Sequence, residues 1–119
     1  MENPGSKSAN ESRIQSLQGL LGRTRTIDMR DDDAFQGVIV QARGLLELSD
    51  QEIADALLVS RPTVNRWING KNLPHPAMRK PILSWVAEQL IKRIKRLTAT
   101  DRLQNALVPA TERVTAKLG

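Results

Sequence analysis

The chain has 119 residues, which suits one compact domain with extensions better than two domains. It has no cysteine and no tyrosine, and its only aromatic side chains are Phe35, Trp67 and Trp85. This composition excludes disulfides and thiolate metal sites, and it argues against the base-stacking platform that single-strand nucleic-acid binders use. No apolar run approaches the length of a membrane span, and the polar N-terminal residues lack a signal-peptide hydrophobic segment. We therefore expect a soluble, cytoplasmic protein.

The net charge of +5 conceals an asymmetry along the chain. Residues 1–60 carry six basic and ten acidic side chains, whereas residues 61–119 carry twelve basic and three acidic ones. A strongly positive second half is typical of a surface that faces phosphate groups.

Residues 1–30 are predicted to be a partly disordered leader with one short helix. Residues 1–12 are polar and have almost no apolar content, which is typical of disorder. Ile14, Leu17, Leu20 and Leu21 have helical spacing and predict an amphipathic helix of about three turns that ends at Gly22. Residues 23–26 would follow as a basic linker. Two interpretations of this helix stay open, namely packing on its own domain and contact with a second copy.

A second helix is predicted from the acidic run at residues 31–33 to about Glu47. Carboxylates at a helix start satisfy free backbone amides and favour the helix dipole, whereas three adjacent carboxylates in a helix cannot all face one metal ion. We therefore predict no metal site here. The apolar positions that would face the core are Phe35, Val38, Ile39, Ala42, Leu45 and Leu46.

The stretch from Ser49 to Lys71 predicts two short helices joined by a tight turn. Ser49 and Glu52 have the spacing of a capping box, and Ile53, Ala54 and Leu57 give a short apolar stripe behind it. The turn falls at residues 58–60. A second stripe consists of Val64, Trp67 and Ile68, and it ends at Asn69 and Gly70, where a left-handed residue can stop a helix.

The second helix of this pair has the chemistry of major-groove readout. It would bury Val64 and Trp67 while leaving Arg61, Asn65 and Arg66 exposed. Arginine can donate two hydrogen bonds to O6 and N7 of guanine, and asparagine matches the N6 and N7 edge of adenine.

The same stretch resembles the phage-repressor helix-turn-helix family, the Cro-like or XRE group. The resemblance is carried by Leu48-Ser49-Asp50-Gln51-Glu52-Ile53-Ala54, by Leu57-Leu58-Val59-Ser60, by Thr63-Val64-Asn65-Arg66-Trp67 and by Gly70. It implies an all-α, compact domain of four to five helices, lambda-repressor-like, at residues 31–97, with helical extensions at both ends. It also implies that Ala54 sits where the two helices approach closely. The DNA-binding residues that the resemblance and the exposed positions indicate are Gln51, Ser60, Arg61, Pro62, Thr63, Asn65, Arg66, Asn69 and Lys71.

Three residues depart from the family pattern. Asp50 stands where a glutamine is usual, and its carboxylate would repel phosphate; Gln51 is the candidate replacement. Leu58 stands at the turn glycine, so either the turn differs or strain is tolerated. Pro62 cannot donate a hydrogen bond, so it can offer a base only apolar contact, and either Ser60 caps the Thr63 amide or Pro62 is the first helical residue.

A long last helix is predicted from Pro81, or from Ala77, to Leu97, after an extended connector at residues 73–76. Pro81 would lie in its first turn or mark a break. Its last turns carry Lys92, Arg93, Lys95 and Arg96, for which a solvated helix end and phosphate contact are equally open. Residues 98–119 predict a short helix from 101 to 108, broken by Pro109, and another after Thr111. This tail is a possible dimerisation element.

The sequence therefore predicts a sequence-specific duplex-DNA-binding transcriptional regulator, a repressor that acts as a homodimer through its recognition helix. Two alternatives stay open: an antitoxin or phage control protein that also binds a protein partner, and a protein-interaction adaptor that has lost base reading. The single histidine, His75, has no nucleophile or acid beside it in any recognisable motif, so we predict no enzyme activity, no catalytic residue and no cofactor.

Overall fold

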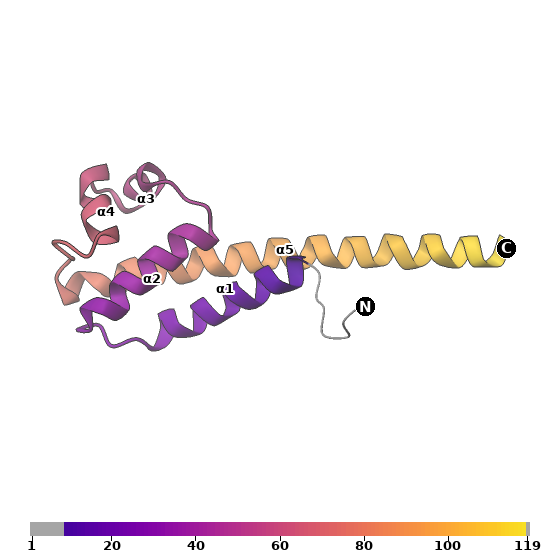
Figure 1. The fold of residues 1–119 in the computed structure, drawn as a ribbon, viewed down its shortest axis with the longest axis horizontal. Helices are drawn as coiled ribbons and strands as arrows, with labels where there is room; N and C mark the ends of the chain where they lie inside the picture. The colour runs from indigo at the N-terminus through magenta and orange to yellow at the C-terminus, as the bar shows by residue number, and fades with distance from the viewer. Residues whose placement is uncertain (1–8, 119) are drawn as a thin grey trace.

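The chain folds into five helices in a computed structural model, which describes the backbone of residues 9–118 and the side chains of residues 9–104 and Ala106 (Figure 1). No strand is present among these residues. The helices are α1 (Ala9–Thr26), α2 (Asp32–Leu45), α3 (Asp50–Leu57), α4 (Arg61–Ile68) and α5 (Pro76–Leu118). The all-α prediction with helical extensions at both ends is confirmed.

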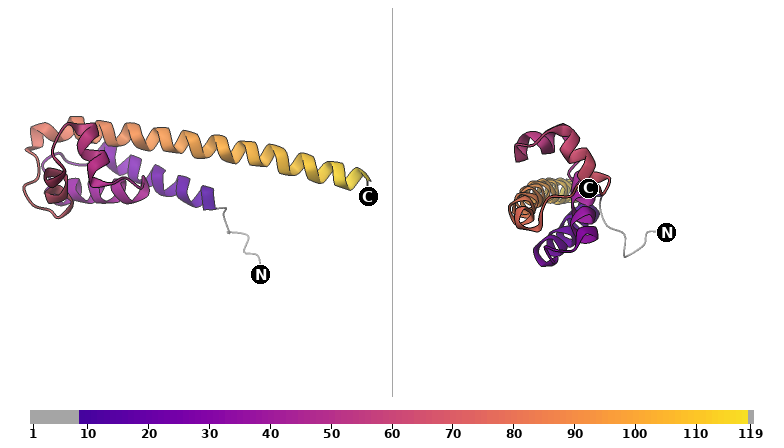
Figure 2. Two further views of the ribbon diagram at one scale, coloured as in Figure 1. Left: turned by 90° about the horizontal axis from the view of Figure 1, so that it is seen from above. Right: turned by 90° about the vertical axis from the view of Figure 1, so that its left-hand side faces the viewer.

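One hydrophobic core lies between α1, α2, the pair α3–α4 and the first half of α5. In Figures 1 and 2, α1 and α2 lie against this half of α5, and α3 and α4 cover the other side of α2. The buried apolar side chains are Leu17, Leu20, Phe35, Val38, Ile39, Ala42, Leu46, Ile53, Ala54, Val64, Trp67, Ile82, Leu83, Val86 and Leu90. Each large side chain of this set stabilises the fold by about 1.5–3 kcal/mol through removal from water. Within the described part of the chain, no helix has the length and apolar character that a membrane span requires.

The start of α2 forms as predicted and is tied to α5 by a buried arginine. Asp31 caps the helix, its Oδ1 accepting from the Ala34 amide at 3.0 Å. Arg79 of α5 has only 3% of its side chain exposed and lies over the ring of Phe35 at 5.1 Å. Its guanidinium contacts Asp32 Oδ1 at 2.8 Å, and it donates to two backbone oxygens, at 2.8 Å to Pro74 and at 2.9 Å to Met29. Arg79 thus joins α2, the loop before it and the connector before α5.

The prediction for the N-terminal helix was wrong at both ends. The helix begins at Ala9 and ends at Thr26, so residues 9–12 are helical and residues 23–26 form its last turns instead of a linker. The extension is stabilised by Thr24, which is buried and donates to the Leu20 carbonyl at 2.7 Å, and by Arg23, which donates to Gln41 of α2. Leu17 and Leu20 are buried, so α1 packs on its own domain. Residues 1–8 of the expected leader lie outside the described residues.

The prediction for the C-terminal half was also wrong in its boundaries. Helix α5 begins at Pro76, with the His75 Nδ1 accepting from the Ala77 amide at 3.0 Å. Pro81 is the sixth residue of α5 and does not break it. The carbonyl that loses its partner there belongs to Ala77, which is exposed, so water can supply the missing hydrogen bond.

The expected break at Pro109 is absent too, because the backbone remains helical to Leu118. An interior proline costs a helix about 3 kcal/mol and can kink it, but it need not end it, because the neighbouring residues keep their own backbone hydrogen bonds. The side chains of Leu107, Val108, Val114 and Leu118 lie outside the described residues.

Candidate nucleic-acid interface

Helix α3 begins with the predicted capping box. The Ser49 Oγ accepts from the Glu52 amide at 3.0 Å, and Glu52 Oε1 accepts from the Ser49 amide at 2.8 Å. Ile53 and Ala54 are buried one turn further on. The box fixes where the helix starts, and the burial of Ala54 fixes which face lies against α4.

The turn between α3 and α4 keeps the usual left-handed geometry although it contains leucine. Leu58 has φ 59° and ψ 42°, and the Val59 amide donates to the Ala54 carbonyl at 3.0 Å, which closes the end of α3. The Leu58 side chain is 90% exposed. Of the two predicted outcomes, the chain therefore adopts the strained one, and packing of Leu58 does not offset the strain.

Helix α4 begins at Arg61 and is capped by Ser60, whose Oγ accepts from the Thr63 amide at 3.2 Å. Pro62 is the second helical residue, where a missing amide hydrogen leaves no broken bond. Val64 and Trp67 are buried, as predicted. They anchor α4 to the core and turn its opposite face to solvent.

The end of α4 determines where Lys71 lies. Gly70 has φ 73°, its amide donates to the Trp67 carbonyl at 3.0 Å, and the Lys71 amide donates to the Arg66 carbonyl at 2.7 Å. A Cβ at Gly70 would come within 3.0 Å of the Gln36 Nε2. That same Nε2 donates to the Ile68 carbonyl at 2.9 Å, so α2 holds the end of α4 in place.

The residues expected to contact DNA gather on one helix pair and its flanks. Eight of the nine are exposed, and Thr63 is half-buried; they are Gln51, Ser60, Arg61, Pro62, Thr63, Asn65, Arg66, Asn69 and Lys71. Arg61, Arg66 and Lys71 form no ion pair with any residue that the structure describes. Their charges are therefore available to an external anion.

Five of these residues form hydrogen bonds within the protein through their side chains, namely Gln51, Ser60, Thr63, Asn65 and Asn69. Ser60 and Thr63 share a hydroxyl–hydroxyl bond of 2.7 Å, and the Gln51 Nε2 donates to Asp55 at 2.8 Å. Ser60 and Thr63 thus act within the helix start.

A chain of polar contacts crosses the interface from α2 to α4. Arg43 Nε donates to Asp50 Oδ1 at 2.7 Å, Asn65 Nδ2 donates to Asp50 Oδ2 at 3.3 Å, and Asn69 Nδ2 donates to Asn65 Oδ1 at 3.2 Å. Burial alone would raise the pKa of Asp50, but the hydrogen bonds from Arg43 and Asn65 and the charges of Arg43 and Arg61 outweigh it and lower the pKa. Asp50 is therefore a carboxylate at neutral pH.

The sequence identified Asp50 only as a departure from the family pattern and did not predict its hydrogen bonds to α2 and α4. The missed residue is Arg43, which lies seven positions before Asp50 and on another helix. The signal available in the sequence was the carboxylate itself, because a carboxylate that is largely removed from water requires a cation or several donors nearby.

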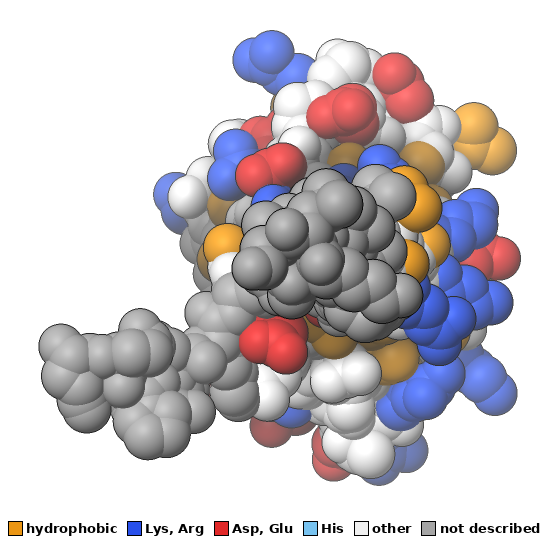
Figure 3. Space-filling model, turned by 90° about the vertical axis from the view of Figure 1, so that its right-hand side faces the viewer, with side chains coloured by type: hydrophobic (Ala, Val, Ile, Leu, Met, Phe, Trp, Pro, Cys, Tyr) orange, Lys and Arg blue, Asp and Glu red, His pale blue; other side chains and the backbone are white. Residues whose placement is uncertain are grey.

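The four basic residues at positions 92–96 of α5 divide into two groups. Lys92, Lys95 and Arg96 are exposed, and Figure 3, seen from the C-terminal end of α5, shows Lys and Arg side chains gathered on one side of the molecule. Arg93 instead points inward and donates to the Leu46 carbonyl at 3.1 Å, at the end of α2. It is thus an internal cap and not part of an exposed basic cluster.

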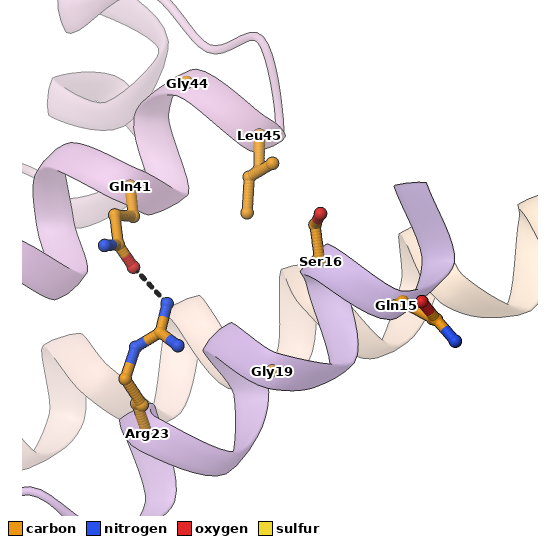
Figure 4. Close-up of a pocket in the computed structure, with 7 residues that line it drawn as sticks. All are labelled: Gln15, Ser16, Gly19, Arg23, Gln41, Gly44 and Leu45. Atoms are coloured by element: carbon orange, nitrogen blue, oxygen red, sulfur yellow. Dashed lines mark hydrogen bonds between the residues drawn. The ribbon is translucent and has the colours of Figure 1, made fainter. Parts of the chain in front are cut away.

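A cleft of about 520 Å³ lies between α1 and α2, away from the helix pair (Figure 4). Its lining residues are Gln15, Ser16, Gly19, Arg23, Gln41, Gly44 and Leu45. Arg23 reaches across it to Gln41. The lining holds no carboxylate and no histidine, so it lacks the partners that acid–base chemistry on Ser16 would require.

Residues 39–78 match a protein-family model described as "Helix-turn-helix". The match runs from the middle of α2 to the start of α5 and includes the whole of α3 and α4. That family consists of DNA-binding regulatory domains and is not an enzyme family. No curated protein and no solved structure matches the chain.

Proposed function

The chain belongs to the Cro-like, or XRE, helix-turn-helix family of DNA-binding regulators, and from this premise we propose that it reads a specific duplex sequence with α4, represses transcription and acts as a dimer. The observation that carries the proposal is the exposed face of α4. It presents Arg61, Asn65 and Arg66 to solvent while Val64 and Trp67 fix the helix in the core.

The side chains on this face suit the edges of base pairs. An arginine that has no acid partner can donate two hydrogen bonds to guanine, and an asparagine amide can pair with adenine. Pro62 lies at the start of the same face and can contribute only an apolar contact, such as with a thymine methyl group. Arg61, Pro62, Asn65 and Arg66 are thus the proposed base contacts.

The flanks of α4 suit the phosphate backbone. Lys71 lies three residues after the last residue of α4, is exposed and forms no ion pair with a described residue. Asn69 and Gln51 are exposed on either side of the face, and Ser60 and Thr63 hold the helix start in shape. We assign backbone contacts to Gln51, Asn69 and Lys71, and positioning to Ser60 and Thr63.

Dimerisation follows from the limited reach of one recognition helix. A single helix contacts roughly 3–4 base pairs, and proteins of this kind gain specificity by binding two half-sites about one helical turn apart. The second half of α5 is the proposed interface because it extends away from the core, where an isolated helix has little stability in water (Figure 1). Leu103 is 62% exposed on this segment, which is consistent with a surface that a second copy covers.

Repression is the proposed mode because it needs nothing beyond occupancy. A dimer seated on a promoter excludes other proteins from the same stretch of duplex. Activation would require an additional contact with the transcription machinery.

The deciding experiment is selection from a random duplex library with the full chain, run beside Arg66→Ala. We expect the parent to enrich an inverted repeat with half-sites about 10 base pairs apart. Arg66→Ala should lose about 1–3 kcal/mol of binding free energy and relax the preference at one base position per half-site. A single, unrepeated site would contradict the dimer, and no enrichment by folded protein would favour the adaptor.

Lys71→Ala provides the contrast. We expect it to weaken binding to all duplexes alike and to lower the slope of log K against log salt by about one, since one phosphate contact is lost. Binding titrations at several salt concentrations measure this slope. A Lys71→Ala protein that keeps its slope and loses base preference would assign Lys71 to the bases instead.

A further inference from the structure

We infer that Asp50, held by Arg43, is a positioning residue. It fixes the direction of the Asn65 amide on α4 and so determines which base edge Asn65 can bind. This inference rests on the proposed function, because it assumes that α4 faces a duplex. It names a specificity-determining contact outside the base-facing surface.

The direction of the Asn65 amide follows from the chemistry of its partners. A carboxylate only accepts hydrogen bonds, so the Asn65 atom at 3.3 Å from Asp50 Oδ2 has to be the NH₂ group. On the other side, the Asn69 Nδ2 lies 2.9 Å from the Asn65 backbone carbonyl, which also only accepts. The Asn69 NH₂ group is thereby fixed, and its contact at 3.2 Å with the Asn65 side chain has to end on Oδ1.

Arg43 fixes the other end of this series of hydrogen bonds. A guanidinium only donates, and its Nε lies 2.7 Å from Asp50 Oδ1. The Asp50 carboxylate has one oxygen for each partner, and only 16% of its side chain is exposed. Each side chain in this series of hydrogen bonds therefore has a single permitted orientation. Rotation of the Asn65 amide by 180° would place its oxygen against the Asp50 carboxylate.

A carboxylate in the first turn of α3 favours the helix dipole, but this does not explain why both Asp50 oxygens accept hydrogen bonds from other helices. The start of α3 is already capped by Ser49 and Glu52 in both directions. The two Asp50 oxygens instead accept from Arg43 of α2 and Asn65 of α4. The effect of Asp50 is to connect the exposed face of α4 to α2.

The fixed amide retains what adenine recognition needs. The Asn65 NH₂ group has two hydrogens, of which Asp50 takes one, and its Oδ1 has two lone pairs, of which Asn69 takes one. The remaining donor and acceptor match N7 and the N6 amino group of adenine. Because their order on Asn65 is fixed, we expect adenine on one strand to be preferred over adenine on the other.

The test compares Asp50→Asn with the parent in the same duplex selection. An asparagine has one oxygen in place of two, so it cannot serve Arg43 and Asn65 together. We expect the adenine preference at one position of each half-site to fall about tenfold, while the other positions keep their preference. Glu88→Gln, an exposed charge-matched control on α5, should leave the whole profile unchanged.

A double-substitution cycle separates positioning from general effects on α4. If Asp50 acts through Asn65, then Asp50→Asn should change nothing further at that position once Asn65→Ala is present. Arg43→Gln should relax the same position as Asp50→Asn, since it removes the group that holds the carboxylate. If Asp50→Asn does not fold, as judged by circular dichroism, the Arg43→Gln profile decides.

The outcomes keep the inference and the proposed function apart. A parent that enriches no site overturns the proposed function and the inference with it. A parent that enriches a site, together with variants that keep the adenine preference, overturns the inference alone. Equal loss at every position would likewise overturn it, because Asp50 would then support the fold of α4 and not the direction of one amide.

Discussion

The helix pair α3–α4 and the first half of α5 are held in the fold by different kinds of contact. The starts of the two short helices depend on short-range contacts, the Ser49–Glu52 box and the Ser60 cap, each of which joins residues three positions apart. Helix α5 depends on long side chains that reach far back along the chain. Arg79 contacts the Met29 carbonyl 50 residues away, and Arg93 contacts the Leu46 carbonyl 47 residues away.

This difference separates the part proposed to face DNA from the part that supports it. In the pair, local contacts define the ends of two helices of eight residues each, which are too short to be stable alone. The stability has to come from the core below, where α5 and α2 bury most of the large apolar residues. Substitutions in α5 should therefore change folding, and substitutions on the exposed face of α4 should change binding.

The largest expected effect on stability is at Arg79. Arg79→Met keeps a long apolar stem of similar volume but leaves the Met29 and Pro74 carbonyls without their donor, so we expect a loss of about 2–4 kcal/mol in unfolding free energy. Urea denaturation followed by circular dichroism measures it. A loss below about 0.5 kcal/mol would show that water replaces the guanidinium at both carbonyls.

Asp32→Asn is the matched control for Arg79. It removes the ion pair and leaves both carbonyl contacts, and the Asp32 side chain is 68% exposed. Because the Asp32 carboxylate is mostly in water and Arg79 keeps its two carbonyl partners, we expect a loss of at most about 1 kcal/mol. A larger loss would assign the stabilising effect to the ion pair and not to the carbonyls.

The next effect is at the close approach of α3 to α4. Ala54 has no exposed surface, so Ala54→Leu has to displace α4 or the core, and we expect a loss of about 1–3 kcal/mol and a lower melting temperature. Ala56→Leu adds the same atoms to an exposed position of α3 and should change stability by less than about 0.5 kcal/mol. An unchanged melting temperature for Ala54→Leu would contradict the close approach.

The same division explains what the sequence could predict. The helix pair, its caps and its buried stripe were predicted correctly because each signal lies within a few residues of its partner. The ends of α1 and α5 were predicted wrongly. Helix α1 continues past Gly22, where Thr24 is buried and Arg23 donates to Gln41, 18 residues away on α2, a contact that no local apolar pattern contains. Helix α5 begins before Pro81 and continues through it.

The candidate site divides in the same way. The exposed residues of α4 could be identified from their spacing around Val64 and Trp67. The link from Arg43 through Asp50 to Asn65 could not, because it joins three helices. A single unusual residue, Asp50 in place of glutamine, was the only trace of it in the sequence.

The smallest expected effect concerns the left-handed residues at which the helices end. Three successive helices end in the same closed turn with a left-handed residue, which is Glu47 after α2, Leu58 after α3 and Gly70 after α4. Only the last is glycine. A non-glycine residue in the left-handed conformation destabilises the fold by about 1–2 kcal/mol. Glycine avoids this cost, but it loses more conformational entropy on folding, which offsets part of the gain.

Leu58→Gly should therefore stabilise the protein by about 0.5–1 kcal/mol in urea denaturation, with an unchanged dependence on urea concentration. Leu58→Ala keeps the strained backbone and removes only exposed atoms, so it should be nearly neutral and isolates the contribution of the backbone. If the alanine variant gained as much as the glycine variant, the leucine side chain and not its conformation would be the source of the cost. If the glycine variant lost stability, the turn at the end of α3 would depend on the side chain of Leu58 and not on its backbone conformation alone.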